Sequence, residues 1–196
     1  MAKVIANMSM SLDGFIAGPH DEVDHLFGWY GTGDVEIPTA MPGLSLHVSQ
    51  ASADVLREAH ANVGALVVGR RLFDLTKGWG GRHPMDVPVF VLTHAAPVDW
   101  AHPEAPFTFV TDGLQSAIDQ AKATAGDGWV GVGSKVASQC LDAGLLDEIH
   151  VDLVPVVLGG GIPFFEGLSS GPFVLEGPDV VEGDGVTHLR YRVKRE

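Results

Sequence analysis

Short apolar runs rich in β-branched residues recur along the chain, separated by turn-forming residues. Most of these runs are apolar at consecutive positions rather than at alternate ones, which is typical of strands covered on both faces of a parallel sheet. The sequence predicts such strands at Val4–Ser11, Ala65–Val68, Val87–Leu92, Phe107–Val110, Trp129–Val132 and Ile149–Val157.

Segments with helical spacing lie between these runs. The clearest is Gly113–Ala125, which has one apolar face and ends before Gly126. Asp112 is expected to cap its start, with Gln115 three residues further on. Other helices are predicted at Val48–His60, over a short stretch from Arg70, and from Ser134 to a stop at Gly144.

The pattern changes after Gly159. Two β-like segments, Phe173–Val181 and Val186–Val193, are joined by Gly183–Gly185, which predicts a hairpin. The 196 residues show no repeat or linker and suit one domain. We therefore predict a single α/β domain over residues 1–196, with a mixed, mostly parallel sheet that finishes in a C-terminal antiparallel hairpin.

Composition narrows the class of protein. With 25 acidic against 12 basic residues and a net charge of −13, nucleic acid and anionic membranes are poor partners. The single cysteine, Cys140, forms no internal disulfide and no zinc site of the CxxC type. No signal peptide and no apolar run of about 18 residues is present, so a soluble cytoplasmic protein is expected.

Two predicted strand-to-helix turns suit phosphate groups. Val68 is followed by Gly69, Arg70 and Arg71, where backbone N–H groups and forked arginine donors gather. The segment Gly131–Lys135 repeats this arrangement, with two glycines and Ser134 at the helix start. Taken alone, each segment could also be a tight strand-to-helix turn whose cationic side chains are solvated and bind no phosphate.

The carboxyl ends of parallel strands share one edge of a sheet, so these turns can converge on one ligand. Thr93 and His94, after the strand Val87–Leu92, add a hydroxyl and a titratable ring at the same edge, unless they form a plain loop. A cofactor with two phosphates is the economical candidate. The segment that begins at Gly131 does not match the dinucleotide-binding fingerprint, because Val136 stands where the third glycine of G-x-G-x-x-G would be.

Two other motifs lack the context that their chemistry needs. Gly167–Gly171 matches the letters of a nucleophile elbow, but Pro172 and a β-like run follow it where a helix is required. His20–His25 holds metal-binding residue types, but they are contiguous in a polar loop, which favours a solvated acidic segment.

Several motifs, in order along nearly the whole chain, resemble the dihydrofolate reductase-like superfamily. The likeness is greatest to the reductase (C-terminal) domain of bifunctional riboflavin-biosynthesis deaminase-reductases. The motifs are Met10–Gly18 (M-S-L-D-G-F-I-A-G), Val68–Arg71, Val91–Thr93, Gly131–Ser134, and Ala143–Ile149 through Pro155–Gly161.

This resemblance implies a three-layer fold with an eight-stranded sheet, NADPH across the strand carboxyl ends, and hydride transfer to a C=N bond in a pyrimidine-like or pterin-like ring. It implies cofactor contacts from Ile16 (nicotinamide), from Gly69, Arg70 and Arg71 (phosphates), from Thr93 and His94 (ribose 2′-phosphate), and from Gly131, Gly133, Ser134, Lys135 and Val136 (pyrophosphate and its surroundings). Leu72 and Val132 depart from the usual threonine and glycine. One cysteine cannot supply the zinc signature of the deaminase half.

Dihydrofolate reductases hold their substrate with a carboxylate on the helix before the glycine–arginine strand. Asp54 falls at about that spacing and is the implied catalytic carboxylate. An acidic residue that is simply exposed on a helix would give the same sequence pattern. A carboxylate in a partly apolar pocket can hold N–H groups of a ring and promote its protonation.

The expected function is NADPH-dependent reduction of a small heterocyclic molecule, of the riboflavin-biosynthesis type. Dihydrofolate reduction is the alternative, and a non-catalytic nucleotide- or flavin-binding module is the alternative of another class. A homodimer is expected through the C-terminal portion, because the run Ile149–Leu158, the pair Phe164–Phe165 and the hairpin offer much apolar surface. The same residues could instead seal the core of one chain.

Overall fold

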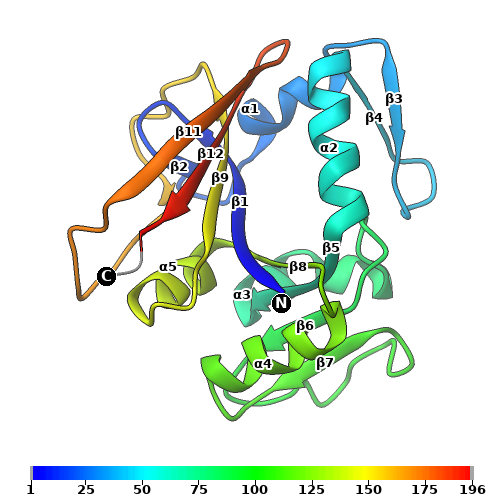
Figure 1. The fold of residues 1–196 in the computed structure, drawn as a ribbon. Helices are drawn as coiled ribbons and strands as arrows, with labels where there is room; N and C mark the ends of the chain where they lie inside the picture. The colour runs from blue at the N-terminus through cyan, green and yellow to red at the C-terminus, as the bar shows by residue number, and fades with distance from the viewer. Residues whose placement is uncertain (1, 195–196) are drawn as a thin grey trace.

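One mixed sheet forms the centre of the molecule (Figure 1). The structure is a computed structural model, and it describes residues 2–194 except for the side chain of Ser134. Within that range the sheet has eight strands, in the order β11-β12-β9-β1-β8-β5-β6-β7. These strands are β1 (Lys3–Ser11), β5 (Val63–Gly69), β6 (Val89–Leu92), β7 (Phe107–Val110), β8 (Trp129–Val132), β9 (Glu148–Val154), β11 (Leu175–Glu182) and β12 (Thr187–Val193).

The pairing of the strands confirms the predicted fold class. β1 runs parallel to both β8 and β9, and β5 runs parallel to β6 and β8. β12 is antiparallel to β9 and β11, so the closing hairpin completes one side of the sheet. The predicted strand boundaries hold to within about two residues, except that β9 ends at Val154 and not at Val157.

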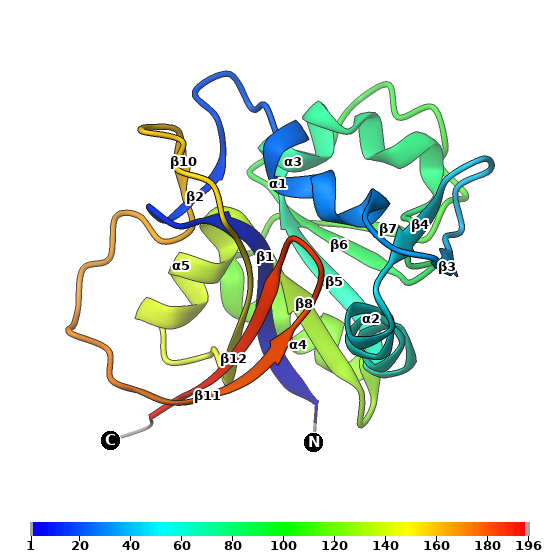
Figure 2. The same ribbon diagram turned by 90° about the horizontal axis from the view of Figure 1, so that it is seen from above.

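Helices cover both faces of the sheet. Buried residues of α4 and α5 pack with Val4, Ala6 and Val130 on one face, whereas Phe73 of α3 packs with Val68 on the other. Figure 2 shows α2 and α5 on opposite sides of β1. The helices are α1 (Asp24–Phe27), α2 (Gln50–Asn62), α3 (Arg70–Leu75), α4 (Leu114–Ala125) and α5 (Ser134–Asp142), with 3₁₀ turns η1 (Gly28–Gly31) and η2 (Lys77–Gly81). Among residues 2–194, no helix has the length and apolar character needed to cross a membrane.

Two small antiparallel pairs were not predicted. β2 (Phe15–Ala17) pairs with β10 (Ile162–Pro163), and β3 (Val35–Pro38) pairs with β4 (Ser45–Val48). The sequence predicted that Val48 begins α2, but Val48 ends strand β4 and the helix begins after it. α2 begins one residue after Ser49, whose hydroxyl accepts a hydrogen bond from the Ser52 N–H at 3.3 Å.

The start of α4 also differs from the prediction. Gly113, at φ 105°, occupies the N-cap position, and no side chain caps the helix. The Asp112 carboxylate instead accepts a hydrogen bond from the Ser116 hydroxyl at 2.8 Å, and Gln115 donates to Asp119 at 3.0 Å. Glycine fits here because the backbone enters the helix through a positive φ.

The C-terminal apolar residues mostly face the interior. Phe164 is only 2% exposed and stacks on Phe165 with ring centroids 4.4 Å apart, so the expectation of an exposed pair is wrong. Ile149 and Val151 are buried in the same core cluster. Val157 remains exposed, and so does β11, where all residues after Leu175 are exposed.

Candidate active site

Three turns follow the carboxyl ends of neighbouring parallel strands. β5 lies between β6 and β8, with Gly69 paired to Leu92 and Val67 paired to Val132, so the three strands end at one edge of the sheet. The structure places at this edge the segments predicted as cofactor contacts, Gly69–Arg71, Thr93–His94 and Gly131–Val136.

Arg70 and Thr93 meet at one backbone carbonyl. The Ala95 oxygen accepts a hydrogen bond from Arg70 Nη1 at 2.9 Å and another from the Thr93 hydroxyl at 2.9 Å. Arg70 Nε also pairs with Asp74 Oδ1 at 2.8 Å, yet 37% of the arginine side chain remains exposed. Two residues predicted to contact one cofactor, from β5 and β6, thus lie side by side.

Arg71 points toward the loop after β2. Its Nη2 atom pairs with both carboxylate oxygens of Asp21, at 2.8 and 2.7 Å. His94 is exposed beside Thr93. Because α3 is only one and a half turns long, the arginine side chains, rather than a helix dipole, supply the positive charge at this turn.

The turn between β8 and α5 is the third turn at this edge of the sheet. Gly133 occupies the N-cap of α5, and Lys135 Nζ lies 2.9 Å from Glu166 Oε1 with 66% of its side chain exposed. The side chain of Val136 is 1% exposed and packs in the core, so only its backbone could contact a ligand. The prediction for the Ser134 side chain falls outside what the structure describes.

Ile16 lies on β2, across the edge from these turns. It is 4% exposed and packs against the main core cluster, while the neighbouring Ala17 pairs with Ile162 of β10. The loop between β1 and β2 is held by Asp13, whose carboxylate accepts hydrogen bonds from the N–H groups of Leu158 and Gly159 at 3.1 and 2.7 Å. These contacts fix the loop that presents Ile16.

Asp54 lies outside this arrangement. Its side chain is 66% exposed and bonds only within α2, to Gln50 at 2.8 Å and to Arg57 at 3.4 Å. It follows Ser52, which points at the sheet, by two residues, a rotation of about 200° around a helix. The carboxylate that the resemblance implied therefore faces away from the sheet.

Neither of the two motifs set aside in the sequence forms a catalytic centre. Ser169 and Ser170 bond to the Asp142 carboxylate, in a loop without flanking strand or helix. Among residues 2–194, no three histidine, cysteine or acidic side chains gather as metal ligands.

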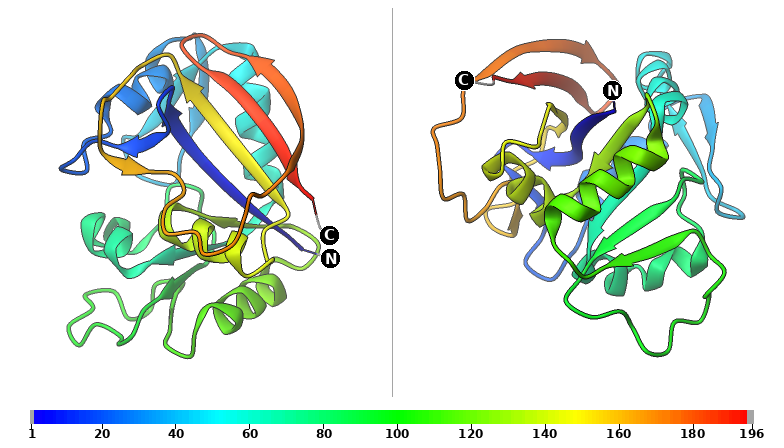
Figure 3. Two further views of the ribbon diagram at one scale, coloured as in Figure 1. Left: turned by 90° about the vertical axis from the view of Figure 1, so that its left-hand side faces the viewer. Right: turned by 60° about the horizontal axis from the view of Figure 1, so that its bottom comes forward.

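The face of β1 that looks toward α2 is polar in the middle of the sheet. β1, β9 and β12 lie side by side (Figure 3), and residues paired across them share a face. Asn7 is exposed although its strand is central, so the sheet is not fully covered here. The first pair from the carboxyl end of β1 on this face is Ser11–Val154. The rows behind it are Ser9–Asp152–His188, Asn7–His150–Arg190 and Ile5–Glu148–Arg192.

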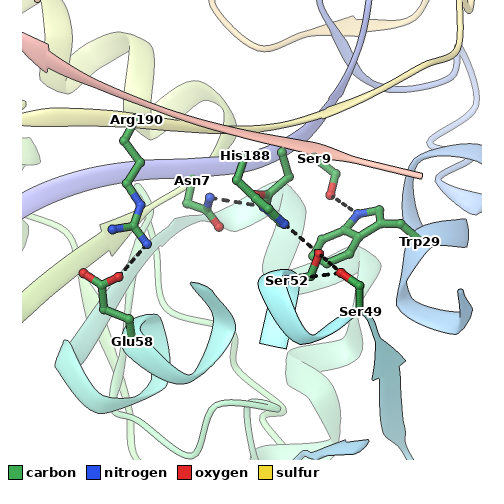
Figure 4. Close-up of polar contacts among 9 residues, drawn as sticks. Asn7, Ser9, Trp29, Ser49, Ser52, Glu58, His188 and Arg190 are labelled. Atoms are coloured by element: carbon green, nitrogen blue, oxygen red, sulfur yellow. Dashed lines mark hydrogen bonds and ion pairs between the residues drawn. The ribbon is translucent and has the colours of Figure 1, made fainter. Parts of the chain in front are cut away.

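The first row continues into α2 through hydrogen bonds (Figure 4). His188 Nδ1 lies 2.7 Å from Asp152 Oδ1, and His188 Nε2 lies 2.9 Å from the Ser52 hydroxyl. The Ser49 hydroxyl donates to Ser52 Oγ at 3.2 Å, and Asn7 Nδ2 lies 3.4 Å from Asp152 Oδ2. His188 is 2% exposed, Ser52 is 1% exposed and Asp152 is 6% exposed.

Two aromatic residues of η1 close the same end. Trp29 Nε1 donates to the Ser9 hydroxyl at 3.1 Å, and its ring packs edge-on against His188. Burial raises the pKa of Tyr30, so this phenol stays protonated at neutral pH. Both aromatic residues therefore offer hydrogen-bond donors to the polar face.

The other rows lead away from the cofactor edge. Arg190 Nη2 pairs with Glu58 of α2 at 2.8 Å, and His150 Nε2 lies 2.9 Å from Glu148 Oε2. Burial lowers the pKa of His150, with Arg190 acting in the same direction. A cavity of about 190 Å³ opens beside these residues, lined also by Lys3 and Trp129. The polar face thus reaches solvent at its far end.

The sequence also matches a known protein family. The family model described as the RibD C-terminal domain matches residues 2–173. The chain belongs to the RibD C-terminal domain family.

Several solved structures are similar to this RibD C-terminal domain. A protein assigned to riboflavin biosynthesis from Shewanella sp. PV-4 is 27% identical, with full coverage of both chains and a TM-score of 0.72. Two more distant structures share the fold. A dihydrofolate reductase from Enterococcus faecalis complexed with NADP(H) is 15% identical at TM-score 0.58, covering 98% of this chain and 97% of that one. A deaminase/5-amino-6-(5-phosphoribosylamino)uracil reductase from Thermotoga maritima is 16% identical at TM-score 0.59, covering 98% of this chain but 57% of that one.

The sequence analysis missed the polar face of this RibD C-terminal domain. A signal was present, because polar residues alternate along three strands: Asn7 and Ser9 in β1, His150 and Asp152 in β9, and His188 with Arg190 in β12. Period-two polarity within otherwise apolar strands indicates one polar face. Nothing in the sequence showed that the three strands are neighbours.

Proposed function

We propose that this protein is an NADPH-dependent reductase of a pyrimidine-like or pterin-like heterocycle, of the riboflavin-biosynthesis reductase type. The observation that carries the proposal is the meeting of Arg70 and Thr93 at the Ala95 carbonyl, on the edge next to the polar face of β1. One ligand at that edge would have phosphates beside cations and its other end beside Ser9 and Asp152.

The residues at the edge fit the cofactor. Arg70 and Lys135 are cations whose side chains remain 37% and 66% exposed, and Thr93 and His94 offer a hydroxyl and a ring nitrogen. When bound, a dihydronicotinamide supplies a hydride. The membership in a reductase family and the NADP(H) complex of the Enterococcus faecalis relative support this choice of cofactor.

The polar face fits the second reactant. Asn7, which is exposed on this face, can both donate and accept hydrogen bonds, as the edge of a pyrimidine or pterin ring does. A fused or single ring lying on this face would exclude water between β1 and α2 and would keep one orientation relative to the cofactor edge. These residues bind and orient; the cofactor carries the redox chemistry.

The experiment combines binding with turnover. We expect NADPH to raise the melting temperature of the protein, and to bind about tenfold to a hundredfold more tightly than NADH, because a charge-assisted contact to the 2′-phosphate is worth about 1.5–3 kcal/mol. Loss of absorbance at 340 nm with 5-amino-6-(5-phosphoribosylamino)uracil, or with dihydrofolate, would identify the substrate class. Equal binding of NADPH and NADH would contradict the Thr93–His94 assignment, and tight NADPH binding without turnover of either compound would favour a non-catalytic module.

A further inference from the structure

One carboxylate of the polar face lies next to the cofactor edge. Asp152 lies opposite Ser9, one row before the last pair of β1, Ser11–Val154, whereas Glu148 lies two rows further back and is engaged by Lys3 at 2.7 Å and by His150. The Asp152 side chain retains 9% of its exposure. Its Oδ2 atom accepts a long hydrogen bond, 3.4 Å, from the amide of the exposed Asn7, so this oxygen is the one beside the exposed part of the polar face.

The other oxygen of Asp152 is held by a directed chain of donors. The Ser49 hydroxyl donates to Ser52 Oγ, which leaves the Ser52 hydrogen for His188 Nε2. A ring that accepts at Nε2 carries its hydrogen on Nδ1, and it donates that hydrogen to Asp152 Oδ1 at 2.7 Å. Every group in this buried chain is satisfied when His188 is neutral, and the chain ends on the carboxyl group.

A hydride added to a C=N bond leaves the nitrogen in need of a proton. Of the two α2 carboxylates, Asp54 points outward and Glu58 is held by Arg190 at 2.8 Å, one row away from Asp152. We infer that Asp152 is the general acid of this protein and that His188, fixed by Ser52, is its positioning residue. The inference rests on the proposed function and adds the residue that completes the reduction.

The step balances as follows. The hydride, with its two electrons, goes to the carbon of the C=N bond, and the π electron pair moves to the nitrogen. That nitrogen takes the proton from Asp152 Oδ2. The carboxylate left behind keeps its hydrogen bond from His188 Nδ1–H, which stabilises the negative charge, and water entering the groove returns the proton.

Other titratable groups surround the pair and bear on any pH profile. Arg190 lies one row back on β12, His150 and Glu148 lie on β9, Glu58 lies on α2, and Tyr30 lies on η1. On β1, Lys3 pairs with Glu148, while Asn7 and Ser9 are uncharged. Because a general acid acts in its protonated form, the pH profile of the wild-type enzyme should have an alkaline limb.

The test compares matched acid-to-amide variants. Asp152→Asn should lower kcat by about a hundredfold or more, as general acids contribute about 10²–10⁴, with NADPH affinity within threefold of wild type and the alkaline limb of the pH profile lost. Asp119→Asn, at an exposed site on α4, is the control, and Asp54→Asn tests the rival carboxylate. Ser52→Ala should shift the limb of the profile without removing it. An Asp152→Asn enzyme with wild-type kcat and pH profile, or an Asp54→Asn enzyme that alone loses activity, would overturn the assignment.

A second measurement needs neither turnover nor a folded variant. Nitrogen-15 spectra of the histidines in the wild-type protein should show His188 as the Nδ1–H tautomer. Observation of the Nε2–H tautomer for His188 would overturn the donor chain. If the wild type does not bind NADPH, the proposed function fails, whereas the tautomer still decides whether Asp152 is held in this way.

Discussion

At the scale of single residues, the proposed cofactor edge carries cations whose side chains remain partly exposed and lie outside the core. Arg70→Ala removes an exposed side chain whose partners, Asp74 and the Ala95 carbonyl, both lie near the surface. We expect NADPH to bind about tenfold or more weakly, from the loss of a charge-assisted hydrogen bond, with a melting temperature close to that of wild type.

Isothermal titration and thermal unfolding check this prediction together. Arg57→Ala is the matched control, because Arg57 is also exposed and also pairs with a helix carboxylate, Asp54, but lies on α2 away from the edge. A large fall in melting temperature for Arg70→Ala with unchanged NADPH affinity would mean that this arginine only joins α3 to the loop after β6.

At the scale of elements, the small β2–β10 pair determines where the first loop lies. Gly161, at φ 145°, passes so close to β2 that a β-carbon there would overlap the Ala17 carbonyl oxygen. Gly161→Ala should therefore destabilise the protein by about 1–3 kcal/mol, through strain and a displaced strand. NADPH affinity should fall as well, because Ile16 is carried by the same strand.

The neighbouring glycine offers the control for this change. Gly160 has open space around its position and an ordinary φ, so Gly160→Ala should leave both the unfolding midpoint and NADPH binding close to wild type. Denaturant unfolding of the two variants measures the difference. Coinciding unfolding curves would show that the β2–β10 contact has no part in holding the loop.

The sequence predicted elements well where a pattern is local and poorly where it depends on contacts. β7 and β8 begin and end at the predicted residues, because apolar β-branched runs bounded by turns define them. The β3–β4 pair was missed, because Ile37 and Val48 are buried in a cluster with residues far apart in the sequence, among them Leu26 and Val154, which no local pattern reports. Asp54 was misplaced for the same reason: spacing along a chain gives the distance to a strand, not the direction of a helix face.

At the scale of the whole molecule, β11 is an uncovered edge of the eight-stranded sheet. Val174, Val180 and Val181, on and next to this strand, are 60%, 53% and 36% exposed. We propose a homodimer that pairs through β11, in place of the Phe164–Phe165 surface, which lies inside the monomer. Paired edges satisfy backbone groups that would otherwise invite aggregation.

Light scattering at low micromolar concentration should give about twice the chain mass. Val180→Lys places a charge at the centre of the proposed interface and should yield single chains, whereas Val98→Lys, at a loop position that is 96% exposed, should remain paired. A wild-type protein with the mass of one chain would refute this assembly.

The central position of β1 has a consequence for biosynthesis. Its partner β9 lies far along the chain, so that Lys3 reaches Glu148 across 145 residues, and His188 joins only when β12 adds to β9. Contacts of such long range form late, which slows folding and leaves the first strand unpaired while the remainder is translated. During that interval Asn7, Ser9 and Ser11 give one face of β1 affinity for water, so the residues that build the groove also limit the tendency of the nascent strand to associate with other chains.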